Sequence, residues 1–152
     1  MGDLKTAAIM AGTGAFLKAG GETVYTMHVT NEANSNFGID TSFGGYTKRA
    51  IGHAGVGALG GLGVYGMLNS SNKKVSTALL GIGTGLGAIK GIYNQIYASQ
   101  HYNSPEYGPG KAEANLEALV RSGGAYAIKG AMVGSGIYGG YEVAKRIAKG
   151  VM

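Results

Sequence analysis

The sequence has 152 residues, of which 30 are Gly and 3 are Phe, and it contains neither Trp nor Cys. This composition offers little large apolar surface for a soluble core, and charged residues make up 14% of the chain where about 25% is usual. The absence of Cys excludes disulfides and Cys-based metal or redox sites, and the net charge of +5 lacks the long basic run of a dedicated nucleic-acid module. We therefore expect much of the surface to face lipid or other protein subunits.

Residues 1–49 are predicted to contain an N-terminal helix and a polar arm. Small residues recur at every fourth position near the start, namely Ala7, Ala11, Ala15 and Ala19. This spacing predicts a helix over residues 4–19, which Gly20-Gly21 is expected to end. Residues 22–30 alternate in polarity and are rich in β-branched side chains, which favours a short strand or an extended arm. The Asn- and Ser-rich sequence that follows extends this polar arm over residues 22–49.

Residues 50–97 are predicted to form a Gly-rich apolar helical hairpin. Residues 50–68 contain no Asp, Glu, Lys or Arg, and about 20 helical residues, each rising ~1.5 Å, cross a ~30 Å hydrocarbon core. Residues 75–97 are expected to form the second helix, in which glycine recurs at every fourth position. Such a ridge without side chains lets another helix approach at close backbone distance. The predicted helix-packing residues of the hairpin are Gly57, Gly61, Gly83, Gly87 and Gly91.

Two further segments complete the predicted all-α fold. Residues 98–122 hold a polar loop with both prolines and a short amphipathic helix over residues 111–121, which Ser122-Gly123-Gly124 is expected to break. Residues 123–152 are predicted to form a Gly/Ala-rich helix with a basic tail. Its predicted helix-packing residues are Gly136 and Gly140.

Three basic pairs flank the apolar segments, and basic residues at the ends of apolar helices commonly meet lipid headgroups. The residues expected to contact headgroups or packaged nucleic acid are Lys48, Arg49, Lys73, Lys74, Lys145 and Arg146. The first two pairs lie at opposite ends of the first apolar helix, so the sequence does not select an orientation across a membrane.

The stretch from Gly83 to Ala88 fits the loose Gly-x-Gly-x-x-Gly/Ala pattern of dinucleotide-binding sites. A structural role is favoured, because such a site needs an acidic residue about 20 positions further on, and position 103 is Asn. His28, His53 and His101 lie far apart, and none has a second ligand at metal-binding spacing. We therefore assign no catalytic, cofactor-binding or metal-binding residue and expect no cofactor and no enzymatic activity.

The ridges Gly83/Gly87/Gly91 and Gly136/Gly140/Ala144 resemble the glycine-zipper segments of small membrane-active proteins, including membrane-associated and DNA-ejection proteins of bacteriophage virions. The resemblance implies a non-enzymatic structural component of a virus particle that packs in multiple copies and inserts into a membrane, with a role in genome delivery. The implied partners are copies of itself, other virion proteins, the lipid bilayer and, non-specifically, packaged nucleic acid. The implied location is the virion, in contact with the host inner membrane or an internal viral membrane.

Three alternatives remain open at this stage. A holin-like or transport pore would line its lumen with Lys90 and Lys129, which interrupt the apolar segments. A soluble, tightly packed helical bundle would use the same glycine ridges. An enzyme would use the Gly-rich stretch as a nucleotide-binding loop, and this is the least favoured alternative.

Overall fold

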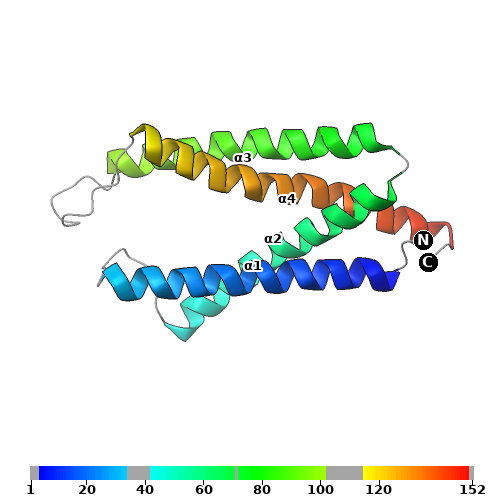
Figure 1. Ribbon diagram of the computed structural model, residues 1–152, viewed down its shortest axis with the longest axis horizontal. Helices are drawn as coiled ribbons and strands as arrows, with labels where there is room; N and C mark the ends of the chain where they lie inside the picture. The colour runs from blue at the N-terminus through cyan, green and yellow to red at the C-terminus, as the bar shows by residue number, and fades with distance from the viewer. Residues whose placement is uncertain (1–3, 34–41, 71, 102–114, 151–152) are drawn as a thin grey trace.

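The computed structural model describes residues 4–33, 42–70, 72–101 and 115–150. Its α-helices are α1 (Leu4–Ala33), α2 (Phe43–Asn69), α3 (Lys73–His101) and α4 (Leu116–Ala148). The described ranges contain no strand, which confirms the predicted all-α fold. The helices alternate in direction, so both chain termini lie at one end of the molecule (Figure 1). We call this the terminal end and the opposite one the distal end.

The helices pack as a row rather than as a closed bundle. Helix α2 packs against α1 on one side and α4 on the other, and α4 in turn packs against α3 (Figure 1). Helices α2 and α3 barely touch, although only a short turn joins them. The predicted hairpin of these two helices is therefore wrong as a packing unit, because α2 packs against α1 and α4, and α3 packs against α4.

Helix α1 continues through Gly20-Gly21 and ends at Ala33. The prediction of a helix end at the glycine pair, and of a strand or extended arm after it, is therefore wrong for residues 22–33. Among the described glycines only Gly150 has a positive φ, so the pair does not adopt the left-handed cap that ends many helices. An ion pair between Lys18 and Glu22, one helical turn apart, spans the glycines and supports the helix.

Helix α2 begins seven residues before the predicted apolar segment, at Phe43. Ser42 is its N-cap, and its hydroxyl oxygen accepts a hydrogen bond from the Gly45 amide at 3.1 Å. Lys48 and Arg49 consequently lie within a helix and not in an extended polar arm. The part of the arm over residues 34–41 lies outside the described residues.

Helix α4 runs without a break through Ser122-Gly123-Gly124, so the predicted short helix and the Gly/Ala-rich helix are one element. Asn115 caps it, with its side-chain oxygen accepting from the Ala118 amide at 2.8 Å. The Ser122 hydroxyl donates to the Gly91 carbonyl at 2.8 Å, so packing on α3 stabilises the stretch where the break was predicted. Residues 111–114 of the predicted short helix lie outside the described residues.

The row has glycine at its contacts and large apolar side chains on its surface. Tyr65 is the only large side chain less than 2% exposed in the described part of the chain, whereas Phe16 and Phe43 are 76% and 88% exposed. In the described ranges the buried hydrophobic residues are only Ala7, Tyr65 and Tyr138, so the helices do not enclose a conventional core.

Candidate functional site

The glycine ridge of α3 packs against α4. A Cβ atom at Gly83, Gly87 or Gly91 would overlap a backbone carbonyl oxygen of α4. The opposing residues Gly130 and Gly134 are equally close, because a Cβ at either would overlap a carbonyl oxygen of α3. Only glycine permits this approach, and the ridge is occupied within the chain rather than left open for another copy.

Helix α2 packs closely against two other helices through glycines on two of its faces. Gly57 and Gly61 lie against the backbone of α1, where a Cβ would overlap the carbonyl oxygens of Gly14 and Met10. On the other side, α2 meets α4 through Gly63, Gly66, Ser135, Gly136 and Gly139. These two faces place α2 between α1 and α4.

Gly140 differs from the other predicted packing residues, because no heavy atom lies within 4 Å of a Cβ built there. The prediction that Gly140 packs against another helix is therefore wrong for contacts within the described part of the chain. Sequence reasoning missed the packing glycines Gly14, Gly63, Gly66, Gly130 and Gly134. Gly63 and Gly66 are three residues apart, a helical spacing that a search for every fourth position overlooks, whereas Gly130 and Gly134 do have the fourth-position spacing.

An apolar groove of about 740 Å³ lies between α1, α2 and α4. Glycines of α2 and apolar side chains of the neighbouring helices line it. The α2 residues that line it are Gly57, Gly60, Gly61, Val64 and Met67, and the others include Ile9, Met10, Leu17, Ile128 and Met132. Lys18 is the one charged residue that lines the groove. We refer to this space between α1, α2 and α4 as the apolar groove.

Charged and titratable residues from three helices meet beside Lys18. Lys18 pairs with Glu22 on α1, and His53 Nε2 on α2 lies 3.9 Å from Glu22 Oε2. On α4, the Lys129 ammonium lies 5.1 Å from the ring centroid of Tyr126. We call Lys18, Glu22, His53 and Lys129 the charged belt.

The carboxylate of the charged belt is held in its ionised form. Burial raises the pKa of Glu22. The hydrogen bond and charge of Lys18, together with the charges of His53 and Lys129, lower this pKa by more than burial raises it. The net result is a pKa below the ordinary value of a glutamate. Lys129 forms no ion pair with the described residues, so the belt retains a net positive charge whether His53 is neutral or protonated.

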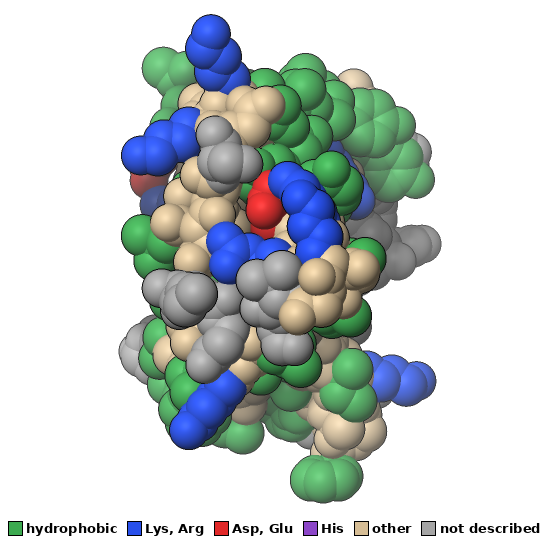
Figure 2. Space-filling model, turned by 90° about the vertical axis from the view of Figure 1, so that its right-hand side faces the viewer, with side chains coloured by type: hydrophobic (Ala, Val, Ile, Leu, Met, Phe, Trp, Pro, Cys, Tyr) green, Lys and Arg blue, Asp and Glu red, His purple; other side chains and the backbone are tan. Residues whose placement is uncertain are grey.

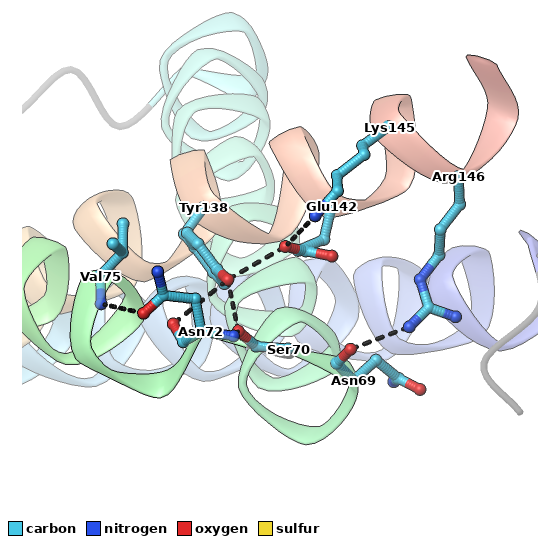
Figure 3. Close-up of polar contacts among 8 residues, drawn as sticks. All are labelled: Asn69, Ser70, Asn72, Val75, Tyr138, Glu142, Lys145 and Arg146. Carbon is cyan, nitrogen blue, oxygen red and sulfur yellow. Dashed lines mark hydrogen bonds and ion pairs between the residues drawn. The ribbon is translucent and has the colours of Figure 1, made fainter. Parts of the chain in front are cut away.

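Polar side chains of α4 hold the turn between α2 and α3 at the terminal end (Figure 3). The Tyr138 hydroxyl donates to Glu142 Oε1 at 3.0 Å and is hydrogen-bonded to the Ser70 hydroxyl. Glu142 is only 4% exposed, and Lys145 Nζ lies 3.6 Å from its carboxylate. Arg146 donates to the carbonyl of Asn69 at 2.8 Å, which satisfies an acceptor at the end of α2.

The predicted basic pairs separate to the two ends of the row. Lys48 and Arg49 lie near the distal end at the start of α2. The terminal end carries Lys5, Lys73, Lys74, Lys145, Arg146 and Lys149. Figure 2 looks onto this end and shows Lys and Arg side chains spread over it, with little acidic surface between them.

Lys90 and Lys129, the predicted pore-lining pair, lie on different helices and are not brought together. Lys90 is exposed on α3, whereas Lys129 is half-buried on α4 beside Glu22 and His53. A lumen lined by both lysines is therefore not formed within one chain. In the described ranges, no three His, Asp or Glu side chains are grouped so that they could hold a metal ion.

Helices α2 and α3 are long and apolar enough to cross a membrane. Only 22% of the apolar stretch of α2 and 17% of that of α3 is buried inside the chain, whereas the core helix of a soluble protein is mostly buried. A comparison with known proteins found no matching family model, no similar curated protein and no similar solved structure.

Proposed function

We propose that the protein is a non-enzymatic, membrane-embedded structural protein whose four-helix row contacts lipid through its exposed apolar side chains. The observation that supports this proposal most strongly is the inverted distribution of side chains. Glycine occupies the helix contacts, while Phe16, Leu86 and other large apolar side chains are exposed. In water this arrangement forfeits most of the hydrophobic free energy of folding, whereas in a bilayer small-residue packing is the usual means of helix association.

A slab without charged residues supports an embedded position. It lies between the terminal end and the charged belt, and it comprises residues 6–17, 54–68, 75–89 and 130–141 of the four helices. At ~1.5 Å per residue the slab is roughly 18–22 Å thick. Lysines at both borders extend their side chains toward headgroups, which adapts the slab to a hydrocarbon core of about 30 Å.

The narrower proposal, a component of a virus particle that assists genome delivery, rests on the glycine-zipper resemblance alone. Packing between copies through Gly83, Gly87 and Gly91 is not part of it, because α4 covers this ridge. Contacts between copies or with other virion proteins would use the outer faces of the row. Detection of the chain in purified particles, at a fixed ratio to the other particle proteins, tests this assignment.

Alkaline carbonate extraction of membranes from cells that express the chain alone tests the membrane proposal. We expect the protein to stay in the membrane pellet, because the apolar side chains of α2 and α3 gain lipid contact only when embedded. Release into the supernatant would contradict the proposal and favour packing of the outer faces against protein. The pore alternative adds a separate expectation, loss of membrane potential during expression.

A further inference from the structure

We propose that the apolar groove binds one anionic phospholipid, with an acyl chain between the apolar side chains of α1 and α4 and the headgroup phosphate at Lys18 and Lys129. This inference rests on the proposed membrane location and adds a specific ligand site to it. The charge of the belt, the shape of the groove and the acidic residues of the chain carry the argument.

The groove has the size and chemistry of a ligand site. Its volume of about 740 Å³ falls within the ~300–1,000 Å³ of small-molecule sites, which combine apolar walls with a few placed polar groups. Gly57, Gly60 and Gly61 of α2 are among its lining residues, and α1 covers Gly57 and Gly61, so the open length of the groove lies between the apolar side chains of α1 and α4. An acyl chain fits such a channel, whereas a polar ligand would find few hydrogen-bonding partners along it.

The groove extends from the charged belt toward the terminal end. On α1 it is lined from Lys18 to Ile9, a distance of roughly 14 Å at ~1.5 Å per residue. On α4 its lining begins at Ile128, next to Lys129. A lipid whose headgroup lies at the belt would therefore place its acyl chain inside the uncharged slab.

The belt supplies a positive charge that a phosphate would neutralise. Lys18 and Lys129 face a single described carboxylate, Glu22, and Lys129 has no ion-pair partner among the described residues. Basic pockets between membrane helices bind the headgroups of anionic lipids. A zwitterionic lipid would bring its own positive charge close to Lys18 and Lys129, so its headgroup would gain less electrostatic binding free energy than that of an anionic lipid.

A helix from a second copy fits the groove less well. To neutralise Lys129 it would need an available acidic side chain. Of the other acids whose side chains are described, Glu117 pairs with Arg121 at 2.5 Å, and Glu142 is buried against Tyr138 and Lys145. Both of these carboxylates already have partners, whereas an anionic lipid carries both the acyl chain and the charge.

Native mass spectrometry of the detergent-purified full chain tests the site, with phosphatidylglycerol and phosphatidylcholine of identical acyl chains as probes. We expect one phosphatidylglycerol to bind preferentially. Lys129→Gln should weaken that binding about fivefold, as expected for one lysine near an anionic headgroup. Lys90→Gln is the matched control, because Lys90 is exposed on α3, and it should leave the affinity unchanged.

A second pair of variants tests the groove itself. Gly60→Leu would place a side chain in the groove, where its Cβ lies 3.1 Å from the flexible Met132 side chain, and should abolish lipid binding. Gly85→Leu lies in open space and should have no effect. Equal binding of both lipids, or equal loss in Lys129→Gln and Lys90→Gln, would overturn the site. Dimers that Gly60→Leu dissociates, without a change in lipid binding, would assign the groove to a second copy instead.

The failure of this site is distinguishable from failure of the proposed function. A chain that stays in carbonate-washed membranes but shows no preference for phosphatidylglycerol contradicts the lipid site alone. A chain that carbonate releases contradicts the membrane location as well.

Discussion

At the scale of single residues, the surroundings of each glycine decide its role. Gly87 and Gly85 are two residues apart on α3, yet a Cβ at Gly87 would overlap the Tyr126 carbonyl oxygen, while one at Gly85 would meet nothing within 4 Å. The first glycine is required for helix packing. The second only lowers the helix propensity of α3, by up to ~1 kcal/mol relative to alanine.

Alanine at these two glycines should therefore have opposite effects. Gly87→Ala should lower the stability of the α3–α4 pair by about 1–3 kcal/mol through overpacking, and Gly85→Ala should leave it unchanged or raise it by up to ~1 kcal/mol. Thermal unfolding in detergent, followed by circular dichroism, measures both. Equal melting temperatures for the two variants would show that α3 and α4 do not pack as described.

Removal of the Tyr138 hydroxyl should also destabilise the fold. Tyr138→Phe leaves the buried Glu142 carboxylate without one of its donors, which should cost about 1–3 kcal/mol. Tyr141→Phe, on the same helix and 58% exposed, is the control and should be nearly neutral. The same thermal measurement distinguishes them, and a neutral Tyr138→Phe would mean that the network in Figure 3 contributes nothing to stability.

At the scale of helices, α1 and α4 both continue through glycine pairs that commonly end helices. In α4, packing of Ser122 and Gly123 against α3 compensates for the weak local propensity. In α1, Gly20 and Gly21 are exposed, and no heavy atom lies within 4 Å of a Cβ at either. The continuity of α1 therefore depends on the Lys18–Glu22 pair and on its packing with α2.

Alanine at both positions of the α1 pair tests this continuity. The double variant Gly20→Ala/Gly21→Ala should raise thermal stability by up to about 2 kcal/mol, because alanine gains helix propensity and meets no neighbour. Circular dichroism should show unchanged or higher helicity. A loss of stability would indicate that the pair forms a turn, as the sequence alone predicts.

At the scale of the whole molecule, the row of helices orders charge along its length. Basic residues lie at the terminal end, an uncharged slab follows, and the charged belt borders the slab on the distal side. Tyr46, Tyr93, Tyr97 and Tyr126 lie beyond the slab on the distal side. Tyrosine is enriched at membrane–water interfaces, so this order suits a bilayer across the slab with the distal part outside it.

The chain contains no cysteine, so single cysteines can report this depth directly. Leu86 in the slab and Val120 near the distal end are 64% and 65% exposed, so the chain itself shields them equally. In membranes, a water-soluble maleimide should label Val120→Cys and not Leu86→Cys. After solubilisation and unfolding both should react. Equal labelling in intact membranes would place the slab in water and contradict the proposed function.

The helical state and the uncharged apolar segments could be predicted from the sequence, because helix spacing and charge are properties of neighbouring residues. Local patterns failed at Ser122-Gly123-Gly124, where packing on α3 compensates for them, and at Gly20-Gly21, where an ion pair within α1 and packing of α1 on α2 support the helix. The glycine spacing identified Gly83, Gly87 and Gly91 as a ridge, but a ridge does not specify which helix it meets.

Only the tertiary structure decided the order of the row and the residues that meet across it. The sequence determined that glycines would let helices approach closely, since the absence of a side chain is a property of the residue itself. It did not determine that α4 would pack between α2 and α3, or that Lys18, Glu22, His53 and Lys129 would form one belt. Those outcomes depend on which helix faces complement each other, and complementary faces come from segments far apart in the chain.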